Sequence, residues 1–77
     1  MDVVQLLGVN VRHYRKLKGM TQEQLAVEAG MERSYVSDLE RGTRNPSVVA
    51  LSRLADALEV KPSTLLEVHI SGDTVGL

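Results

Sequence analysis

The segment at 21–40, TQEQLAVEAGMERSYVSDLE, constrains the fold of this chain more than any other. Thr21 can cap a helix, and Gln24, three residues later, can complete a capping box by binding the backbone N–H of Thr21. Gly30 suits a sharp turn, because glycine adopts a positive φ without steric penalty. Ala26 is small where a second helix would pass close over the first. The segment therefore predicts two short helices joined by a tight turn and crossing at a steep angle.

The second of these helices has two chemically different faces. Val36 and Leu39 lie three residues apart on one face, where they can pack on Leu25 and Ala26 of the preceding helix. The other face carries hydrogen-bonding side chains rather than the Lys/Glu mixture of an ordinary solvated surface: Glu32, Arg33, Ser34, Tyr35, Ser37, Asp38 and Arg41. Side chains of this kind can bind base edges in the major groove of DNA, so the pattern indicates a DNA-reading surface.

The order and spacing of several short motifs resemble the Xre/Cro-type, lambda-repressor-like helix-turn-helix family. The motifs are TQEQLA, the turn at Gly30, YVSDLERGTRNPS and LSRLADALEV, and the resemblance covers roughly Val9 to Leu66. It implies an all-α, compact five-helix DNA-binding domain, in which helices 2 and 3 form the helix-turn-helix and a recognition helix at about 32–41 enters the major groove. The run at 33–37 is similar to that of restriction–modification controller proteins, with phage-type repressors and plain transcriptional regulators as the alternatives.

Apolar periodicity outside 21–40 predicts three further helices, which makes the expected fold class all-α. The first runs from about Asp2 to Lys18, ends before Gly19 and carries Val4, Leu7, Val11 and Tyr14 at spacings of three and four. Ser47 caps a fourth helix whose apolar stripe is Val48, Leu51, Leu54, Ala55 and Leu58. Pro62 begins a fifth helix with a buried face of Leu65, Leu66, Val68 and Ile70.

A single domain of residues 1–70 with a flexible tail at 71–77 fits a chain of 77 residues. Cysteine is absent, which excludes disulfides and thiolate metal sites and suits a reducing cytosol. No apolar run is long enough for a signal peptide or a membrane span. We therefore expect a soluble, cytoplasmic protein that contacts no membrane.

Catalytic chemistry finds no support in the sequence. His13 and His69 are isolated, and no paired carboxylates, metal-binding spacing or glycine-rich phosphate loop accompanies them. We therefore expect a protein that is not an enzyme and that holds no metal ion and no cofactor.

The net charge of −1 gives the whole chain no general attraction to a polyanion. The distribution of charge is uneven, because the segment at 12–18 contains no acid and holds Arg12, Arg15, Lys16 and Lys18. Acids lie outside the proposed DNA-facing segment at Asp2, Asp56, Glu59, Glu67 and Asp73. We expect an electrostatically two-sided molecule whose DNA binding is modest and strongly sensitive to salt.

The polar face of the recognition helix supplies the candidates for base contact, which are Arg33, Ser34, Tyr35, Ser37 and Asp38. Arg33 is the best of them, since a guanidinium pairs with the O6 and N7 atoms of guanine, although contact with phosphate alone is its alternative. The two serines could be neutral surface, and Tyr35 could lie partly in the core. Three roles stay open for Asp38: accepting from a cytosine amino group, orienting Arg41, or repelling wrong sequences.

A second set of residues is expected to contact DNA phosphates: Gln22, Thr21, Arg12, Arg41, Thr43, Arg44 and Asn45. The family resemblance implies this role for Gln22, where a helix start can hold an anion, and for Arg44 and Asn45 after the recognition helix. A plain exposed side chain is the alternative for Gln22. Arg15 and Glu40 resemble a family pair that forms a partly buried salt bridge between the first and third helices, so we interpret them as scaffold.

The expected partners are double-stranded DNA and a second copy of the chain. A two-fold homodimer would place two recognition helices in successive major grooves, about 34 Å apart, on a pseudo-palindromic operator. The fifth helix is the expected dimer surface, with Leu66, His69 and Ile70, and with Val68 as a further candidate. RNA polymerase is an additional candidate partner if the protein activates transcription, through Glu23 and Glu28.

A protein-interaction module, such as an antitoxin or an adaptor with the same fold, is the alternative function. The near-neutral charge and Asp38 favour this alternative. Gln22, Arg33 and Arg44, together with the basic segment at 12–18, favour DNA. We therefore expect a sequence-specific transcriptional regulator.

Overall fold

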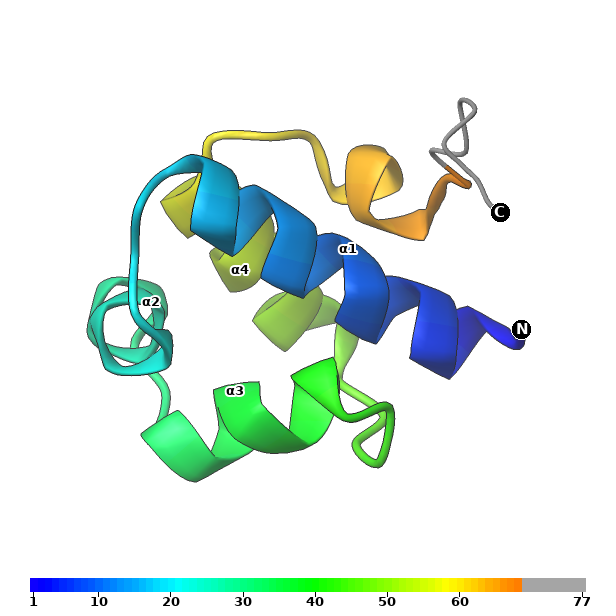
Figure 1. Ribbon diagram of the computed structural model, residues 1–77, viewed down its shortest axis with the longest axis horizontal. Helices are drawn as coiled ribbons and strands as arrows, with labels where there is room; N and C mark the ends of the chain where they lie inside the picture. Colours follow the sequence, from blue (N-terminus) through cyan, green and yellow to red (C-terminus); the bar gives the residue numbers. More distant parts are fainter. Residues whose placement is uncertain (69–77) are drawn as a thin grey trace.

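The computed structural model describes residues 1–68, which form a series of helices joined by short loops (Figure 1). They are α1 (Val3–Leu17), α2 (Gln22–Ala29), α3 (Arg33–Glu40), α4 (Val48–Leu58) and the 3-10 helix η1 (Pro62–Leu66). The described part is therefore all-α, but the expected fifth α-helix is a short 3-10 helix instead. The tail expected at 71–77, together with His69 and Ile70 of the expected dimer surface, lies outside the described residues.

The helix starts are fixed by local side-chain caps. At Thr21, the Gln24 N–H donates to the threonine hydroxyl (3.1 Å), and the Thr21 N–H donates to the Gln24 amide oxygen (2.8 Å), which confirms the predicted capping box. Asp2 and Gln5 form a second capping box at the start of α1. Ser47 caps α4 as predicted. These caps satisfy N–H groups that would otherwise have no partner at a helix start.

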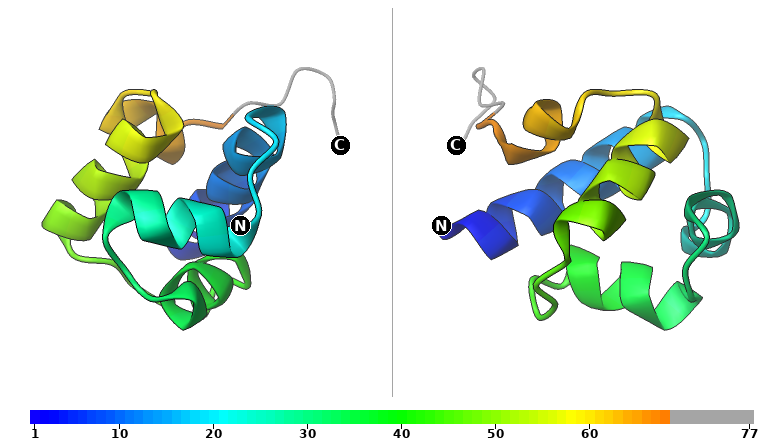
Figure 2. Two further views of the ribbon diagram at one scale, coloured as in Figure 1. Left: turned by 90° about the vertical axis from the view of Figure 1, so that its left-hand side faces the viewer. Right: turned by 180° about the vertical axis from the view of Figure 1, so that it is seen from behind.

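The turn between α2 and α3 follows the prediction for Gly30. Gly30 ends α2 in the left-handed conformation, with φ of 70° and ψ of 39°. Directly after it, the Met31 N–H donates to the carbonyl oxygen of Ala26 at 2.9 Å. Figures 1 and 2 show that α2 and α3 cross at a steep angle after this turn. The two helices therefore have the arrangement that the sequence predicted.

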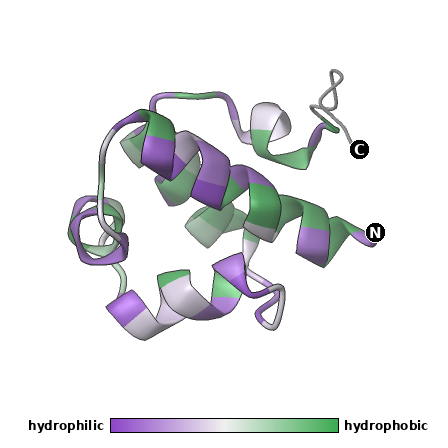
Figure 3. Cartoon of the chain, viewed as in Figure 1, coloured by the Kyte–Doolittle hydropathy of each residue, from purple (hydrophilic) through white to green (hydrophobic). Residues whose placement is uncertain are grey.

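One hydrophobic core lies between the helices. Its largest fully buried side chains are Leu25, Leu39, Leu54, Leu65, Val11 and Val36. α3 packs against α1 and α2, α2 also packs against α4, and η1 covers α1 and α4. Figure 3 shows mostly polar or neutral colours along α3. The apolar side of α3 is therefore used for folding, and its polar side is left for solvent or a ligand.

Apolar residues at the start of α4 and after Leu65 are exposed. Leu65 is fully buried, but Leu66 is 42% exposed and Val68 is 64% exposed. The backbone becomes extended at Glu67, so the chain leaves the core after the short 3-10 helix. Val48 is 82% exposed because it is the first residue of α4 and precedes the turn that reaches the core. The predicted burial of Leu66 and Val68 within this chain is wrong, and their exposure leaves them available for the expected contact with a second copy, which stays a prediction.

Asn10 fastens η1 to α1. It is only 3% exposed, and its side-chain Nδ2 donates to the carbonyl oxygens of Leu65 and Glu67, both at 2.8 Å. No role was predicted for Asn10 from the sequence, although it lies at helical spacing from Leu7 and Tyr14 and so shares the buried face of α1. A polar side chain on such a face needs hydrogen-bond partners, and the carbonyl groups at the end of η1 supply them.

Gly8 allows α1 and α3 to approach until their backbones touch. A Cβ atom on Gly8 would lie 2.2 Å from the carbonyl oxygen of Leu39 and 3.2 Å from that of Glu40. These atoms belong to the backbone, which cannot rotate away as a side chain can. Gly8 therefore determines how close α3 lies to α1.

We predict that Gly8→Ala destabilises the domain. Alanine favours a helix over glycine by about 1 kcal/mol, so intrinsic propensity alone would raise stability. The clash with Leu39 should outweigh this gain and lower the free energy of unfolding by about 1–3 kcal/mol. Urea denaturation measures the change, with Val9→Ala on the exposed side of α1 as the control. A Gly8→Ala variant as stable as the wild type would contradict the close approach.

Candidate nucleic-acid interface

A bidentate ion pair between Arg15 and Glu40 joins α1 to the end of α3. Arg15 Nε lies 2.6 Å from Glu40 Oε2, and Arg15 Nη2 lies 3.0 Å from Glu40 Oε1. Their side chains are 11% and 4% exposed. The hydrogen bond to Glu40 raises the pKa of the Arg15 guanidinium, against the opposing effect of burial. The pair therefore has the scaffold geometry that the family resemblance implied.

The same carboxylate also binds Gln22 at the start of α2. Gln22 Nε2 donates to Glu40 Oε1 at 3.0 Å, and Arg15 Nη1 donates to the carbonyl oxygen of Met20 at 2.8 Å. Glu40 thus connects α1, the start of α2 and the end of α3. Because the Gln22 amide has a second N–H, this bond leaves a donor for phosphate, and the phosphate contact stays a prediction.

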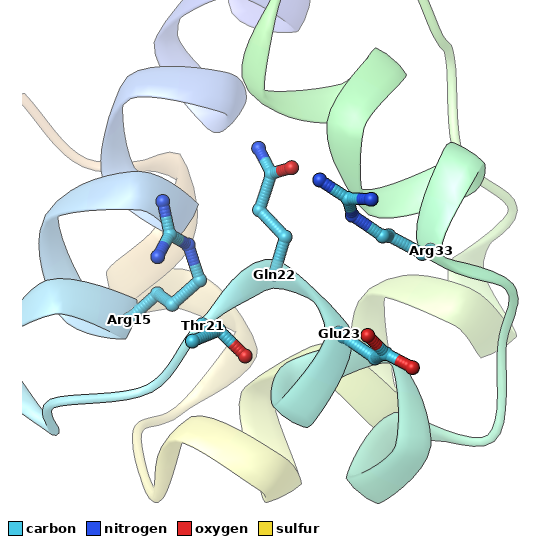
Figure 4. Close-up of a pocket in the computed structure, with 5 residues that line it drawn as sticks. All are labelled: Arg15, Thr21, Gln22, Glu23 and Arg33. Carbon is cyan, nitrogen blue, oxygen red and sulfur yellow. The ribbon is translucent and has the colours of Figure 1, made fainter.

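Next to this network is an open hollow between α2 and the start of α3 (Figure 4). Arg15, Thr21, Gln22, Glu23 and Arg33 line it. Figure 4 shows Gln22 and Arg33 projecting to the same side of the hollow, from two different helices. The first N–H groups of α2 and these side chains suit an anion, whereas the Glu23 carboxylate opposes one.

A second polar cluster lies at the C-terminal end of α3, centred on Asp38. Asp38 pairs with Arg41 and, at 3.4 Å, with Arg44. Arg41 Nη1 also donates to the Ser37 hydroxyl at 2.8 Å. The Arg44 guanidinium lies 4.6 Å from the ring centroid of Tyr35, a cation–π contact. We call these residues, together with Thr43, the Asp38 cluster.

Most of the predicted site residues fall into two groups beside α3. The hollow contains Thr21, Gln22 and Arg33, and the Asp38 cluster contains Tyr35, Ser37, Asp38, Arg41, Thr43 and Arg44. Ser34 is exposed on α3 between them. Arg12 is exposed on α1, and Asn45 lines a separate groove between α1 and α4, so neither joins the two groups.

Two of the four cations in the basic segment at 12–18 form ion pairs with acids in the structure. Arg15 is paired with Glu40, and Lys18 Nζ lies 2.7 Å from Glu59 Oε1. The ion pair with Lys18 lowers the pKa of the Glu59 carboxyl group. The segment therefore contributes fewer free cations than we expected, because acids from α3 and from the end of α4 approach it in the fold.

We predict that Arg15→Met costs about 3 kcal/mol of folding stability, because it leaves the buried Glu40 carboxylate without its cation. Thermal unfolding followed by circular dichroism measures the loss. Lys18→Met is the matched control, since it removes an exposed ion pair and should leave the melting temperature nearly unchanged. An unchanged melting temperature for Arg15→Met would show that the pair is not part of the scaffold.

Within residues 1–68, no helix has the length and apolar character needed to cross a bilayer. A family model described as Helix-turn-helix matches residues 11–65 of this chain. The control protein C.BamHI of Bacillus amyloliquefaciens is 44% identical to it over 69 residues, which cover 88% of this chain and 85% of that protein.

Solved structures share the same fold. The restriction-modification controller protein C.AhdI from Aeromonas hydrophila aligns with a TM-score of 0.78 and 44% identity, over 80% of this chain and 94% of that one. The master regulator for biofilm formation SinR, in complex with DNA, aligns with a TM-score of 0.76 and 39% identity, over 79% of this chain and 98% of that one. The chain belongs to the helix-turn-helix family, with α2 and α3 as the motif.

Proposed function

We propose that this chain is a sequence-specific, double-stranded DNA-binding transcriptional regulator that acts as a dimer on a pseudo-palindromic operator. The observation that carries the proposal is that α3 has a buried apolar side and an exposed polar side. Val36 and Leu39 are fully buried, whereas the polar side of the helix faces outward and is not needed for the core. The relative SinR, with the same fold, was solved in complex with DNA, which supports the same mode of binding.

The dimensions of α3 suit the major groove. An α-helix with its side chains is about 10–12 Å across, which fits the major-groove width of about 12 Å, and the 8 residues of α3 make about two turns of such a helix. Arg33 is exposed at its first turn, and no side chain among residues 1–68 forms an ion pair with it. In the proposed complex, Arg33 reaches a guanine edge while Ser34, Tyr35 and Ser37 contact neighbouring bases.

Phosphate contacts from the hollow and from the Asp38 cluster hold α3 in register. The hollow offers Thr21 and Gln22 on one side, and the Asp38 cluster offers Arg41, Thr43 and Arg44 on the other. Phosphate contacts position a protein and carry no sequence information, so specificity is assigned to the residues between them. Arg12 and Asn45 lie outside both groups and are the weakest members of the proposed phosphate set.

An apolar groove marks the proposed dimer surface. It lies between the start of α1, the start of α4 and η1, and its lining includes Val3, Val4, Leu7, Val48, Leu51 and Leu66. Val3, Val48 and Leu66 are large apolar residues with high exposure, 58%, 82% and 42%. A second copy of the chain would remove this apolar surface from water, and two-fold pairing is the usual arrangement of such regulators.

The relatives support a regulator of the restriction–modification controller type. C.BamHI and C.AhdI both bear the controller designation and match most of this chain. For an activator, RNA polymerase is the proposed further partner. Glu28 is the better of the two acidic candidates on α2, because Glu23 lines the hollow beside Arg33.

Selection of bound duplexes from a random library at low salt tests the proposed function. We predict an inverted-repeat motif whose half-sites lie one helical turn apart, with binding that weakens steeply as salt rises. Arg33→Ala should lower affinity for the selected duplex by about 1–3 kcal/mol and relax the preference at one position per half-site. No enrichment above unselected duplexes would favour the protein-interaction module instead.

We predict that Leu66→Glu disrupts the dimer without unfolding the domain, because the carboxylate would be buried without a partner. Sedimentation equilibrium should show a shift toward monomer, and affinity for the selected duplex should fall. Val27→Glu is the matched control, since Val27 is 74% exposed on α2 and lies outside the groove. Equal association of both variants and the wild type would place the dimer surface elsewhere.

A further inference from the structure

We infer that Asp38 sets the sequence discrimination of this protein. Its carboxylate holds Arg41 and Arg44 against α3 until the right base in a duplex takes their place as its hydrogen-bond partner. The inference rests on the proposed DNA-binding function and deepens it. It gives a specific role to an acid that lies in the middle of a surface meant for phosphates.

Both oxygens of the Asp38 carboxylate are engaged by arginines. Oδ1 pairs with Arg41 Nη2 one turn later in the chain, and Oδ2 lies 3.4 Å from Arg44 Nη2 in the following loop. The Asp38 side chain is 27% exposed, so the carboxylate is partly shielded from water. The two guanidiniums are more exposed, at 61% and 44%.

Further contacts keep the two arginines on the helix. Arg41 donates to the Ser37 hydroxyl, and Arg44 stacks on the Tyr35 ring. The Thr43 hydroxyl and N–H both donate to the Asp38 carbonyl oxygen, at 3.1 and 3.0 Å, which fixes the start of the loop that carries Arg44. The unbound protein thus presents these arginines as partners of α3 and not as extended, free cations.

This arrangement opposes binding to DNA in general. The Asp38 cluster offers one net positive charge where its two arginines alone would offer two. A phosphate that binds Arg41 or Arg44 must also compete with the Asp38 carboxylate and be repelled by it. Phosphates are the same in every duplex, so this cost lowers affinity for all sequences alike.

The cost is offset only where the groove presents a donor to the released carboxylate. A cytosine amino group in the major groove is such a donor, and a carboxylate accepts from it. A duplex with cytosine at this position regains a hydrogen bond for Asp38, whereas guanine presents only acceptors and thymine presents an acceptor and a methyl group. Adenine also carries an amino donor, but its N7 acceptor lies beside that donor and repels the second carboxylate oxygen. Asp38 therefore widens the difference between right and wrong sequences, and such a difference is what specificity requires.

Asp38→Asn tests the inference, because asparagine has nearly the same shape without the charge. We expect affinity for an unrelated duplex to rise about tenfold. The slope of log affinity against log salt concentration should become steeper by about one. Affinity for the selected duplex should change much less, so the ratio between the two duplexes falls. Repeating the library selection with this variant should show a lost cytosine preference at one position per half-site.

Asp56→Asn is the matched control, since Asp56 is exposed on α4 and its removal changes the net charge by the same amount. It should affect both duplexes slightly and equally. Asp38→Ser removes the same carboxylate and gives an independent variant should Asp38→Asn have a lowered melting temperature.

The outcomes separate this inference from the proposed function. If the wild type binds no duplex, the proposed function fails and the inference fails with it. If the wild type binds but Asp38→Asn changes both duplexes equally, as Asp56→Asn does, Asp38 has no role in discrimination. If Asp38→Asn weakens binding to both duplexes, Asp38 only supports the arginines, and the inference is wrong.

Discussion

The Glu40 carboxylate is the point on which the position of the DNA-facing helix depends. It accepts two hydrogen bonds from Arg15 on α1 and one from Gln22 at the start of α2. A buried carboxylate is costly without such partners, so the three segments are tied together by the need to satisfy it. Gly8 sets the distance between α1 and α3, and the Glu40 network sets which way α3 faces.

Ion pairs reduce the positive charge that the described surface presents to DNA. Arg15 and Lys18 are paired with acids that are distant in sequence, and Asp38 pairs with Arg41 and Arg44. Each of these pairs lowers the positive charge that the surface offers to phosphates. In the proposed complex, base contacts must therefore supply affinity that the paired arginines and lysine do not.

Much of the motif could be predicted because its signals are local. The Thr21 cap and the Gly30 turn depend on residues within one turn of each other. Gly8 could not be recognised in the same way, since a glycine within a helix gives no sign of the carbonyl group that approaches it from α3. The pairing of Lys18 with Glu59 likewise arises only in the fold.

The end of the chain shows the limit of apolar periodicity. A repeating pattern predicted burial for Leu66 and Val68, but periodicity does not show where a core ends. In the candidate site, the role of Arg15 and Glu40 came from the family resemblance, whereas the pairing of Asp38 with Arg44 needed the loop geometry. Side chains that meet through a loop have no fixed spacing in sequence.

Two-dimensional ¹H–¹⁵N NMR of the protein titrated with its selected duplex tests most directly whether α3 contacts DNA. We predict that the amide signals that shift most belong to the start of α2, to α3 and to the loop at 41–45, on one continuous surface. Signals from η1 and the exposed side of α4 should change little, apart from effects at the dimer surface. Shifts centred on α4, with α3 unaffected, would contradict the claim that α3 reads DNA.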